Sequence, residues 1–456
     1  MNLFDPSDAR HVHFIGVAGA GMSALALVAR SRGVSVSGCD LDPTGAADLT
    51  ALGVEVLSGH DVSHLKGARA VVVSAAVADT NPELQYARQA GIMVVPRKRA
   101  LADLVAPGQV IGIAGTHGKT TTTVMTCQML TAAGLAPTGI AGGRVTQWGG
   151  NAKVGEGDLF VVEADEFDRA FLELNPWMAV VTNVEPEHLE CYGSVAGMEA
   201  AFTSFLERAD VVVIPAEDAA IQRVSSEVVN QIVSFGVGAG DVRVTDVAPA
   251  PDHTLCAVSL PDGKDISVRL QVPGLHNVRN AAAAISVVWK MGAPLGPAIE
   301  GLEAFTGVGR RFERLGEAKG IEFVDDYAHH PSEVRAVLAA ARQAFPDRRL
   351  VVVFQPHLYS RTEREGDAMG RALAEADQVV VTDVYAAREE PIPGITGEGV
   401  ADAARAGGVE TLYQPDREAL QERVYQLLRP GDVLLTLGAG DVTHVGRALV
   451  EWLRAA

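Results

Sequence analysis

Short apolar runs alternate along the chain with Ala-rich stretches, a pattern typical of proteins in which strands and helices follow one another. The first pair predicts a strand at His11–Ile15 and a helix from about Met22 to Arg32. Further strands are predicted at Val34–Gly38, Ala70–Ser74, Val110–Ala114, Leu159–Val162, Met178–Thr182, Asp210–Pro215, Ile321–Val324, Leu350–Phe354, Gln378–Thr382 and Asp432–Leu437. Two more helices are predicted at Val124–Ala133 and Asn280–Lys290. The chain is therefore expected to have an α/β fold.

Turn signals divide this pattern into three units. Pro107-Gly108 ends the first unit, and Gly307–Gly309 precedes the third. The predicted domains are 1–107, 108–308 and 309–456. The chain length of 456 residues also favours about three domains of roughly 100–200 residues each. Within the second unit, Ser234–Val272 alternates polar and apolar residues with few helix signals, which predicts a small antiparallel subsheet.

Composition narrows the class of protein. The formal net charge of -19 argues against non-specific nucleic-acid binding, which needs a basic face, although loop amides can still bind a nucleotide. The four cysteines are far apart and form no CxxC pair; they are Cys39, Cys127, Cys191 and Cys256. Buried free thiols are expected, not a metal cluster or a disulfide framework, and this suits a reducing cytoplasm. No signal peptide and no apolar run of ~18 residues is found, so no membrane insertion is expected.

The strongest chemical signal is a Gly-rich loop after the predicted strand Val110–Ala114. It contains Gly115, Thr116, His117, Gly118, Lys119, Thr120 and Thr121. Between a strand and a helix, such a loop points backbone N–H groups at phosphate oxygens. Lys119 can then reach the β- and γ-phosphates, and the Thr120 hydroxyl can ligate Mg²⁺. Ile113 occupies the first Gly position of the usual GxxxxGK(S/T) pattern, and a Gly-rich turn with an incidental Lys is the structural alternative.

Carboxylates follow the next predicted strands. Glu163–Glu166 ends one strand, and Asn183–His188 follows another. Because the carboxyl ends of parallel strands gather at one sheet edge, both segments can face the phosphates. Carboxylates there are natural Mg²⁺ ligands. A solvated acidic loop is the structural alternative, and a lone His188 would be ambiguous.

A second Gly-rich turn, Gly16–Ser23, follows the first strand. Its later part contains Gly19, Ala20, Gly21, Met22 and Ser23. It is similar to a dinucleotide-binding fingerprint, with Asp40 about 20 residues further on, although Ala18 stands where the second Gly belongs. The turn could bind the diphosphate of NAD or of another nucleotide, or it could be purely structural.

Three polar segments lie later in the chain. Pro273–Asn280 precedes a helix, where Asn can cap the helix or contact a base. Asp325–Pro331 and Gln355–Arg361 each follow a predicted strand. They place His, Asp and Arg where ligand sites form in α/β sheets, although plain helix starts would explain them too.

Taken in order, these segments resemble the Mur ligase family, the amide-bond-forming enzymes of peptidoglycan assembly. The segments in family order are 115–121, 163–166, 183–188, His276-Asn277, Arg311 and Asp326, and the resemblance covers essentially the whole chain. Other marks are similar to the alanine-adding branch of the family. They are Gly19–Ser23, His117, Asp325–Pro331, Gln355–Arg361 and Asp383–Ile392.

The resemblance implies Rossmann-like first and third domains around a central P-loop mononucleotide-binding domain. It implies that ATP activates the carboxylate of UDP-N-acetylmuramate as an acyl phosphate, that L-alanine attacks it, and that ADP and phosphate leave. One or two Mg²⁺ ions are implied as cofactors. The first domain is expected to bind the UDP sugar, and the third to close on hinges near Pro107-Gly108 and Gly307–Gly309. Monomer and homodimer both remain open.

The resemblance also implies roles for single residues. Catalytic roles fall to Lys119, Glu163, His188, Asp326, His357 and Arg361. ATP contacts fall to Gly115–Thr121, Asn277, Asn280 and Arg311. UDP-sugar contacts fall to Gly19–Ser23, Asp40, His188 and Tyr327, and metal ligands are Thr120, Glu163 and His188. The general base is left open between Asp326, His357 and His329.

Some positions depart from the family pattern. Glu187 stands where Asp usually precedes the His, so its role is open, and Phe167 replaces a small Ser. No Lys occurs between Lys153 and Lys264, although some sister ligases use a carbamylated Lys downstream of the His to help hold a second Mg²⁺. Three other functions stay open: a sister ligase that attaches a peptide, an NAD-dependent oxidoreductase, and a P-loop regulatory switch.

Overall fold

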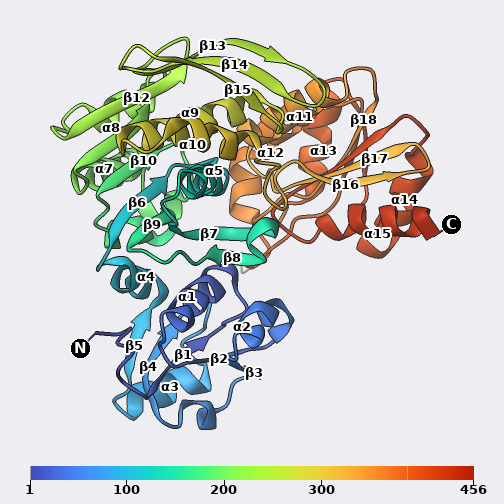
Figure 1. Ribbon diagram of the computed structural model, residues 1–456. Helices are drawn as coiled ribbons and strands as arrows, with labels where there is room; N and C mark the ends of the chain where they lie inside the picture. Colours follow the sequence, from blue (N-terminus) through green and yellow to red (C-terminus); the bar gives the residue numbers. More distant parts are fainter. Residues whose placement is uncertain (1, 388, 456) are drawn as a thin grey trace. The chain divides into compact units, whose positions relative to one another are not determined.

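The computed structural model describes residues 2–387 and 389–455, and its strands form three separate sheets (Figure 1). The first sheet has the order β3-β2-β1-β4-β5 and parallel registers throughout. Its strands are β1 His11–Ile15, β2 Val36–Asp40, β3 Glu55–Ser58, β4 Ala68–Val73 and β5 Met93–Pro96. Its helices are α1 Ala20–Ser31, α2 Ala47–Ala51, α3 Pro82–Gln89 and α4 Arg97–Val105, with the 3-10 turns η1 Pro43–Ala46 and η2 Val62–Leu65. This strand order is Rossmann-like, as predicted.

Strand β1 separates two apolar layers, because successive side chains of a strand point to opposite faces. Val12 and Phe14 belong to the larger core, which includes residues of α1. Ile15 belongs to a smaller core together with Leu84 of α3. His13 alternates with Val12 and Phe14, and it is fully buried. A polar side chain therefore lies in the layer between β1 and α3.

The second sheet has ten strands in the order β15-β14-β13-β12-β11-β10-β6-β9-β7-β8. They are β6 Gln109–Ala114, β7 Thr138–Val145, β8 Gly150–Lys153, β9 Leu159–Glu163, β10 Met178–Val181, β11 Val211–Pro215, β12 Gln231–Val237, β13 Val242–Pro249, β14 Thr254–Ser259 and β15 Asp265–Leu270. Strand β6 pairs in parallel with β10 and β9, whereas β7 and β8 are antiparallel. The strands predicted between 234 and 272 extend this same sheet, and β12 is parallel to both β11 and β13.

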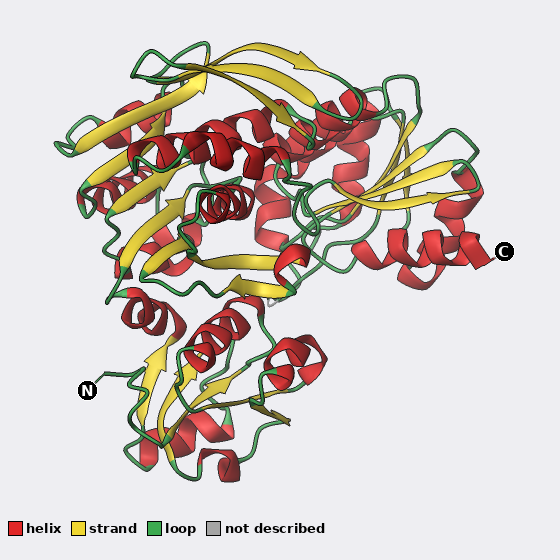
Figure 2. Ribbon diagram, in the orientation of Figure 1, coloured by secondary structure: helices red, strands yellow, loops and turns green. Residues whose placement is uncertain are grey.

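Helices flank the ten-stranded sheet (Figure 2). They are α5 Lys119–Ala132, α6 Leu189–Tyr192, α7 Val195–Glu207, α8 Ala219–Ser225, α9 Leu275–Lys290 and α10 Leu295–Glu303, with η3 Thr146–Trp148 and η4 Phe167–Glu173 as 3-10 turns. Helix α5 packs against β7, β9 and α10. It begins at Lys119, earlier than the predicted Val124, because its buried threonines gain more from packing than their low helix propensity costs. Helix α9 likewise begins before the predicted Asn280.

The third sheet has the order β16-β17-β21-β18-β19-β20, and only the edge pair β16–β17 is antiparallel among its recorded registers. Its strands are β16 Glu313–Ala318, β17 Ile321–Asp326, β18 Leu350–Phe354, β19 Gln378–Val381, β20 Glu410–Tyr413 and β21 Val433–Leu437. Its helices are α11 Pro331–Ala344, α12 Tyr359–Leu373, α13 Gly397–Ala406, α14 Arg417–Leu427 and α15 Thr443–Ala455. Two apolar cores surround this sheet, one with residues of α11, α12 and α13 and one with residues of α14 and α15.

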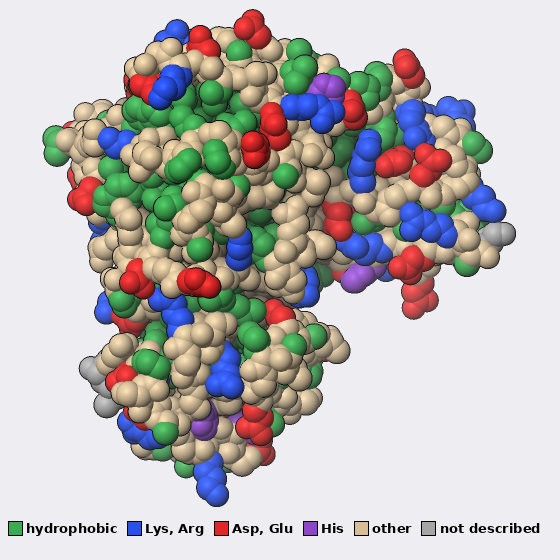
Figure 3. All heavy atoms as spheres, in the orientation of Figure 1, with side chains coloured by type: hydrophobic (Ala, Val, Ile, Leu, Met, Phe, Trp, Pro, Cys, Tyr) green, Lys and Arg blue, Asp and Glu red, His purple; other side chains and the backbone are tan. Residues whose placement is uncertain are grey.

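By tertiary contacts the chain forms two compact units. The first unit contains 1–245, 257–268 and 279–305, and the second contains 246–256, 269–278 and 306–456. The first unit thus contains the first sheet and most of the second, while β13, β14 and β15 are divided between the two units. The domain boundaries drawn from the sequence stay a prediction. Within the described ranges, no helix is long and apolar enough to cross a membrane. On the face drawn in Figure 3, basic and acidic side chains are interspersed.

Candidate active site

The Gly-rich loop joins the end of β6 to the start of α5. Gly115 and Gly118 have φ angles of 127° and 81°, in a region that L side chains rarely adopt. Gly118 is the left-handed cap of α5, and a Cβ there would lie 2.5 Å from Oδ1 of Asn280. Asn280, a predicted ATP contact, therefore borders the loop closely. The free N–H groups at the start of α5 make this loop suited to phosphate.

The segment after β10 holds this loop in place. The backbone N–H of His117 donates to Oδ1 of Asn183 at 2.9 Å, and Nδ2 of Asn183 donates back to the carbonyl of His117 at 3.0 Å. The Thr182 hydroxyl also donates to that carbonyl, at 2.5 Å. Thr116 exchanges hydrogen bonds with the backbone of Glu185 at 3.1 and 2.8 Å. Asn183 lies in the segment predicted to face the phosphates, but no individual role was predicted for Thr182 or Asn183.

Lys119 lies at the mouth of the loop. Its Nζ donates to the carbonyls of Gly115 and Thr116 at 2.7 and 3.1 Å, and it forms an ion pair with Glu166 at 2.7 Å. Burial by itself would lower the pKa of Lys119, but the carboxylates of Glu166 and Asp165 outweigh it, and the pKa is raised. The ammonium group is therefore charged and already aimed at the loop. Glu166, only 2% exposed, lies in the acidic segment 163–166 that was predicted to face the phosphates, but no individual role was predicted for it.

Two oxygen donors border the same glycines of β7. Glu163 accepts a hydrogen bond from the N–H of Gly142 at 2.6 Å, and a Cβ on Gly143 would lie 3.7 Å from Cγ2 of Thr120. The carboxylate of Glu163 and the hydroxyl of Thr120 are hard oxygen ligands beside a phosphate-binding loop, which fits Mg²⁺. The Glu163 carboxylate occupies the space beside Gly142, because a Cβ on that glycine would lie 2.8 Å from Oε1 of Glu163. The roles of Thr120 and Glu163 as metal ligands stay a prediction.

His188, the third predicted metal ligand, immediately precedes α6 in a left-handed conformation with φ 52°. Its ring meets Phe167 edge-on, with 5.0 Å between ring centroids. Its two ring nitrogens lie 4.0 Å from Glu187 and 3.4 Å from Glu190. His188 therefore stands on the loop after β10, and its described contacts are with this local group and not with Glu163.

In the first sheet, the Gly-rich turn leads into α1. Oδ2 of Asp40 accepts a hydrogen bond from the N–H of Ala18 at 3.0 Å, so this carboxylate braces the turn. Nδ2 of Asn151, on β8, donates to the carbonyl of Ala20 and to Oγ of Ser23 at 2.9 and 3.1 Å. Met22 is buried at 2% exposure. Of the predicted residues, Gly19 caps α1, Ala20, Gly21, Met22 and Ser23 form its first turn, and Asp40 ends β2; Asn151 ties the start of α1 to the second sheet.

The second unit gathers the remaining predicted residues around aromatic rings. The ring of His329 lies 5.2 Å from that of Tyr327 and 5.8 Å from that of His357. Nδ1 of His357 lies 3.1 Å from a guanidinium nitrogen of Arg361, and the guanidinium of Arg311 lies 4.9 Å from the Tyr327 ring. Asn277, which donates to the carbonyl of Pro273 at 2.7 Å, also belongs to this unit. This group is rich in donors for anionic substrate oxygens.

Asp326 ends β17 and is only 5% exposed. Its two carboxylate oxygens accept hydrogen bonds from the N–H groups of Phe312 and Ala328 at 2.7 and 2.8 Å. Burial raises the pKa of Asp326 to about 6, against the opposing effects of Arg311 and of these two N–H groups. A carboxyl with this pKa can exchange a proton near neutral pH, as a general base must. The same hydrogen bonds also give it a structural role.

Three protein-family models match the chain and together span most of it. Residues 11–108 match the model described as Mur ligase family, catalytic domain. Residues 113–288 match the Mur ligase middle domain, and residues 310–440 match the Mur ligase, glutamate ligase domain.

Individual proteins agree with these matches. A UDP-N-acetylmuramate–L-alanine ligase of Salinibacter ruber is 42% identical over 97% of this chain and 95% of its own length. The crystal structure of a UDP-N-acetylmuramate–alanine ligase from Thermotoga maritima has a TM-score of 0.84 and 31% identity, and the match covers 98% of this chain and 99% of that one. A murein peptide ligase from Psychrobacter arcticus has a TM-score of 0.73 and 25% identity, with 98% and 99% covered. With its loop, carboxylates and three-sheet architecture matched over nearly its full length, the chain belongs to the Mur ligase family.

Proposed function

We propose that this protein is an ATP-dependent ligase that joins L-alanine to the carboxylate of UDP-N-acetylmuramate and releases ADP and phosphate, in the synthesis of peptidoglycan precursors. The observation that carries the proposal is the loop at 115–121, closed on α5 with Lys119 at its mouth, in a chain 42% identical to a curated alanine ligase over 97% of its length. The higher TM-score and identity of the alanine ligase structure also favour alanine over a peptide as the group added.

The loop is proposed to bind ATP and to assist transfer of its γ-phosphoryl group to the substrate carboxylate. A free carboxylate is a poor acyl donor, so an acyl phosphate supplies the activated form. Lys119 offsets the negative charge that develops on the transferred group. Thr120 and Glu163 would hold Mg²⁺, with His188 at a second ion, and the metal would supply further charge neutralisation. Asn280, which borders Gly118, is proposed to contact the nucleotide.

The second unit is proposed to hold the amine. His357 and Arg361 bind carboxylate or phosphate oxygens, and Asn277 and Arg311 contact ATP. Asp326, whose pKa of about 6 suits proton exchange, is our choice of general base over His357 and His329. The attack of the L-alanine amino group on the acyl phosphate forms the amide bond and expels phosphate.

The UDP sugar is proposed to bind the turn at Gly19–Ser23, with Asp40 holding that turn in shape and with His188 and Tyr327 as further contacts. We also infer a cytoplasmic location, because the four cysteines, all described, are free thiols, as expected in a reducing compartment. Closure of the third domain would exclude water that would otherwise hydrolyse the acyl phosphate.

The proposal is tested by measuring phosphate release from ATP with UDP-N-acetylmuramate and each amino acid in turn. We expect release with L-alanine and not with a tripeptide containing L-Ala-D-Glu. Ligation of the tripeptide alone would identify a sister enzyme and contradict the proposal.

The role of Lys119 is tested by Lys119→Ala. Phosphate release should fall by about 100-fold or more, because one charged donor to the transition state is lost, while the Kd for the UDP sugar stays within about twofold. Lys264→Ala, which removes an exposed Lys that is paired with Asp262, is the matched control and should leave turnover unchanged. Unchanged turnover in Lys119→Ala would remove this residue from the proposed chemistry.

A further inference from the structure

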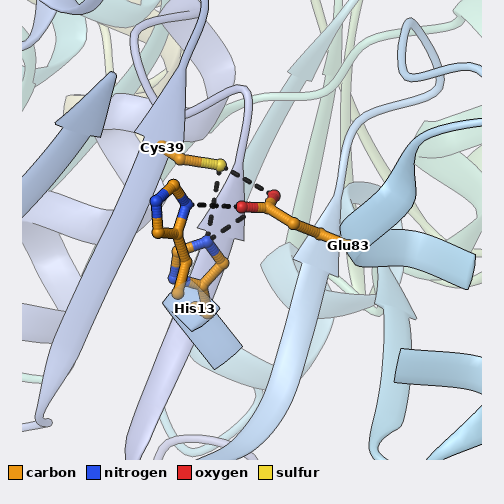
Figure 4. A group of neighbouring side chains, drawn as sticks. His13, Cys39 and Glu83 are labelled. Atoms are coloured by element: carbon orange, nitrogen blue, oxygen red, sulfur yellow. Dashed lines mark hydrogen bonds and ion pairs between the residues drawn. The ribbon is translucent and has the colours of Figure 1, made fainter. Parts of the chain in front are cut away.

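Four side chains with metal-binding atoms meet in the layer between the first sheet and α3. His13 comes from β1, Cys39 from β2, His64 from η2 and Glu83 from α3. One ligand atom from each lies within 4.8 Å of all the others. Figure 4 shows the side chains of His13, Cys39 and Glu83 converging on one point. None of these residues belongs to the nucleotide site.

The distances between the ligand atoms of this cluster are close to those found around a tetrahedrally coordinated metal ion. Nε2 of His13 lies 3.4 Å from Sγ of Cys39, Sγ lies 2.9 Å from Oε2 of Glu83, and Nε2 of His13 lies 3.9 Å from the same oxygen. Zn²⁺ bonds of about 2.0–2.3 Å place tetrahedral ligands roughly 3.3–3.7 Å apart. Small side-chain movements are therefore enough to seat an ion between these three atoms. Nδ1 of His64, 2.6 Å from Oε1 of Glu83, is placed to be the fourth ligand.

Neighbouring groups orient the ligands. Nδ1 of His13 lies 2.8 Å from Oγ of Ser37, and when it donates there, the lone pair of Nε2 faces the cluster. The N–H of Asp61 donates to Oε1 of Glu83 at 3.1 Å. In proteins, hydrogen bonds from neighbouring groups to metal ligands fix the ring orientation and the basicity of those ligands.

Burial and charge favour a cation here. The side chains of His13 and Glu83 are fully buried, and so is Cys39, whereas the His64 side chain is 13% exposed. One thiolate, one carboxylate and two neutral imidazoles would balance the two positive charges of the ion. A neutral complex avoids the cost of an unbalanced charge in the protein interior.

We propose that His13, Cys39, His64 and Glu83 form a zinc site in the first domain, separate from and additional to the proposed ligase site. Binding breaks the S–H bond of Cys39, releases that proton to solvent and forms the Zn–S bond. His60 gives the ion a path inward, because its side chain is 18% exposed and its Nδ1 lies 3.3 Å from Sγ of Cys39. The mixed sulfur, nitrogen and oxygen donors select Zn²⁺ over Mg²⁺.

The test uses the full chain, stripped with a chelator and then loaded with Zn²⁺ or Co²⁺. Metal analysis after desalting should give about one zinc per chain, and Co²⁺ should produce a thiolate-to-metal charge-transfer band. Cys39→Ser should abolish that band and weaken zinc binding at least tenfold. Cys256→Ser, which changes another buried cysteine, is the matched control. It should keep the charge-transfer band and the affinity for zinc.

Glu83→Gln provides a second variant that keeps the thiol. It should retain the charge-transfer band but bind zinc more weakly than the wild type, with an unchanged circular dichroism spectrum. A folded wild type with no charge-transfer band, or a band lost equally in Cys256→Ser, would overturn the proposal and leave a plain hydrogen-bonded network. Neither measurement depends on ATP turnover, so this result is independent of the ligase assays.

Discussion

Gly118 shows how one backbone position decides whether the phosphate-binding loop can form. Its φ of 81° is open to glycine, whereas other L residues lose about 1–2 kcal/mol there. Asn280 occupies the space into which a Cβ would point. Two separate physical reasons therefore require glycine at this position, one conformational and one steric.

Gly118→Ala should lower the affinity for ATP by at least about tenfold, because Asn280 and the first N–H groups of α5 are displaced together. Gly134→Ala is the control, since Gly134 has a φ of 85° but nothing within 4 Å of the added Cβ. That variant should lose about 1 kcal/mol of stability and keep its affinity. Isothermal titration with a non-hydrolysable ATP analogue measures the affinity of both variants. Equal affinities of Gly118→Ala and Gly134→Ala would show that the contact with Asn280 has no effect.

Strand ends are the elements that place most of the candidate chemistry. Glu163 ends β9, Asp326 ends β17, and the segment that clamps the loop follows β10. The pairing of neighbouring strands sets where each strand ends, and therefore where these side chains lie. Asp326 shows what it costs to bury a carboxyl group at a strand end. Burial disfavours the charged form, and the pKa of Asp326 is raised from 3.8 to about 6.

This pKa predicts how stability changes with pH. Between about pH 4 and 6 the folded chain keeps a proton that the unfolded chain loses, so the free energy of unfolding falls as pH rises. For Asp326 the loss amounts to at most about 3 kcal/mol, and it persists above pH 6. Asp326→Asn removes this contribution, so its apparent melting temperature should rise relative to that of the wild type by several degrees across the window.

The measurement is thermal unfolding at pH steps from 4 to 7, compared as differences between variant and wild type. The absolute stability of Asp326→Asn also changes, because an amide cannot accept both backbone N–H groups, but this loss does not vary with pH. Asp347→Asn, which changes an exposed carboxylate in the same unit, should follow the wild type. A constant difference between Asp326→Asn and wild type would contradict the raised pKa.

Most strands could be predicted from the sequence, because buried parallel strands are short apolar runs with clear ends. His11–Ile15 and Leu350–Phe354 match the observed β1 and β18 residue for residue. The start of α5 could not be predicted, since threonines have low helix propensity and only tertiary burial holds them in a helix. Strand β3, with two exposed ends, was also missed.

The candidate site was predictable in part. The loop and the carboxylates carry local patterns, so Lys119 and Glu163 could be named from the sequence. The pairing of Lys119 with Glu166 depends on the distance between two strand ends, which no local pattern encodes. The cluster around Cys39 was also missed, because its four ligands come from four elements and no two share a spacing typical of metal sites.

At the scale of the whole molecule, the loop at 115–121 belongs to the first unit. A ligand that binds only this folded unit should stabilise it and leave the second unit unchanged. At 100 times its Kd, such a ligand contributes about 2.7 kcal/mol to the free energy of unfolding.

A single substitution allows the first unit to be observed alone. Of the four tryptophans, only Trp452 lies in the second unit, where it packs against Tyr425 on the surface. In Trp452→Phe, tryptophan fluorescence should report unfolding of the first unit, and an ATP analogue with Mg²⁺ should raise that transition temperature. The same change in a Gly118→Ala background should give a smaller increase, and an equal increase in both backgrounds would contradict a role of the loop in nucleotide binding.

The division of the chain between the two units also bears on the order in which the protein is made. Segments 246–256 and 269–278 belong to the second unit, while 257–268 and 279–305 return to the first. A ribosome that adds about 5–20 residues per second completes the first unit at residue 305, while 306–456 is still unmade. The nucleotide loop and Asn280 can therefore assemble on the nascent chain. For the same reason, splitting the gene at any single codon cannot yield the two units as separate, self-sufficient polypeptides.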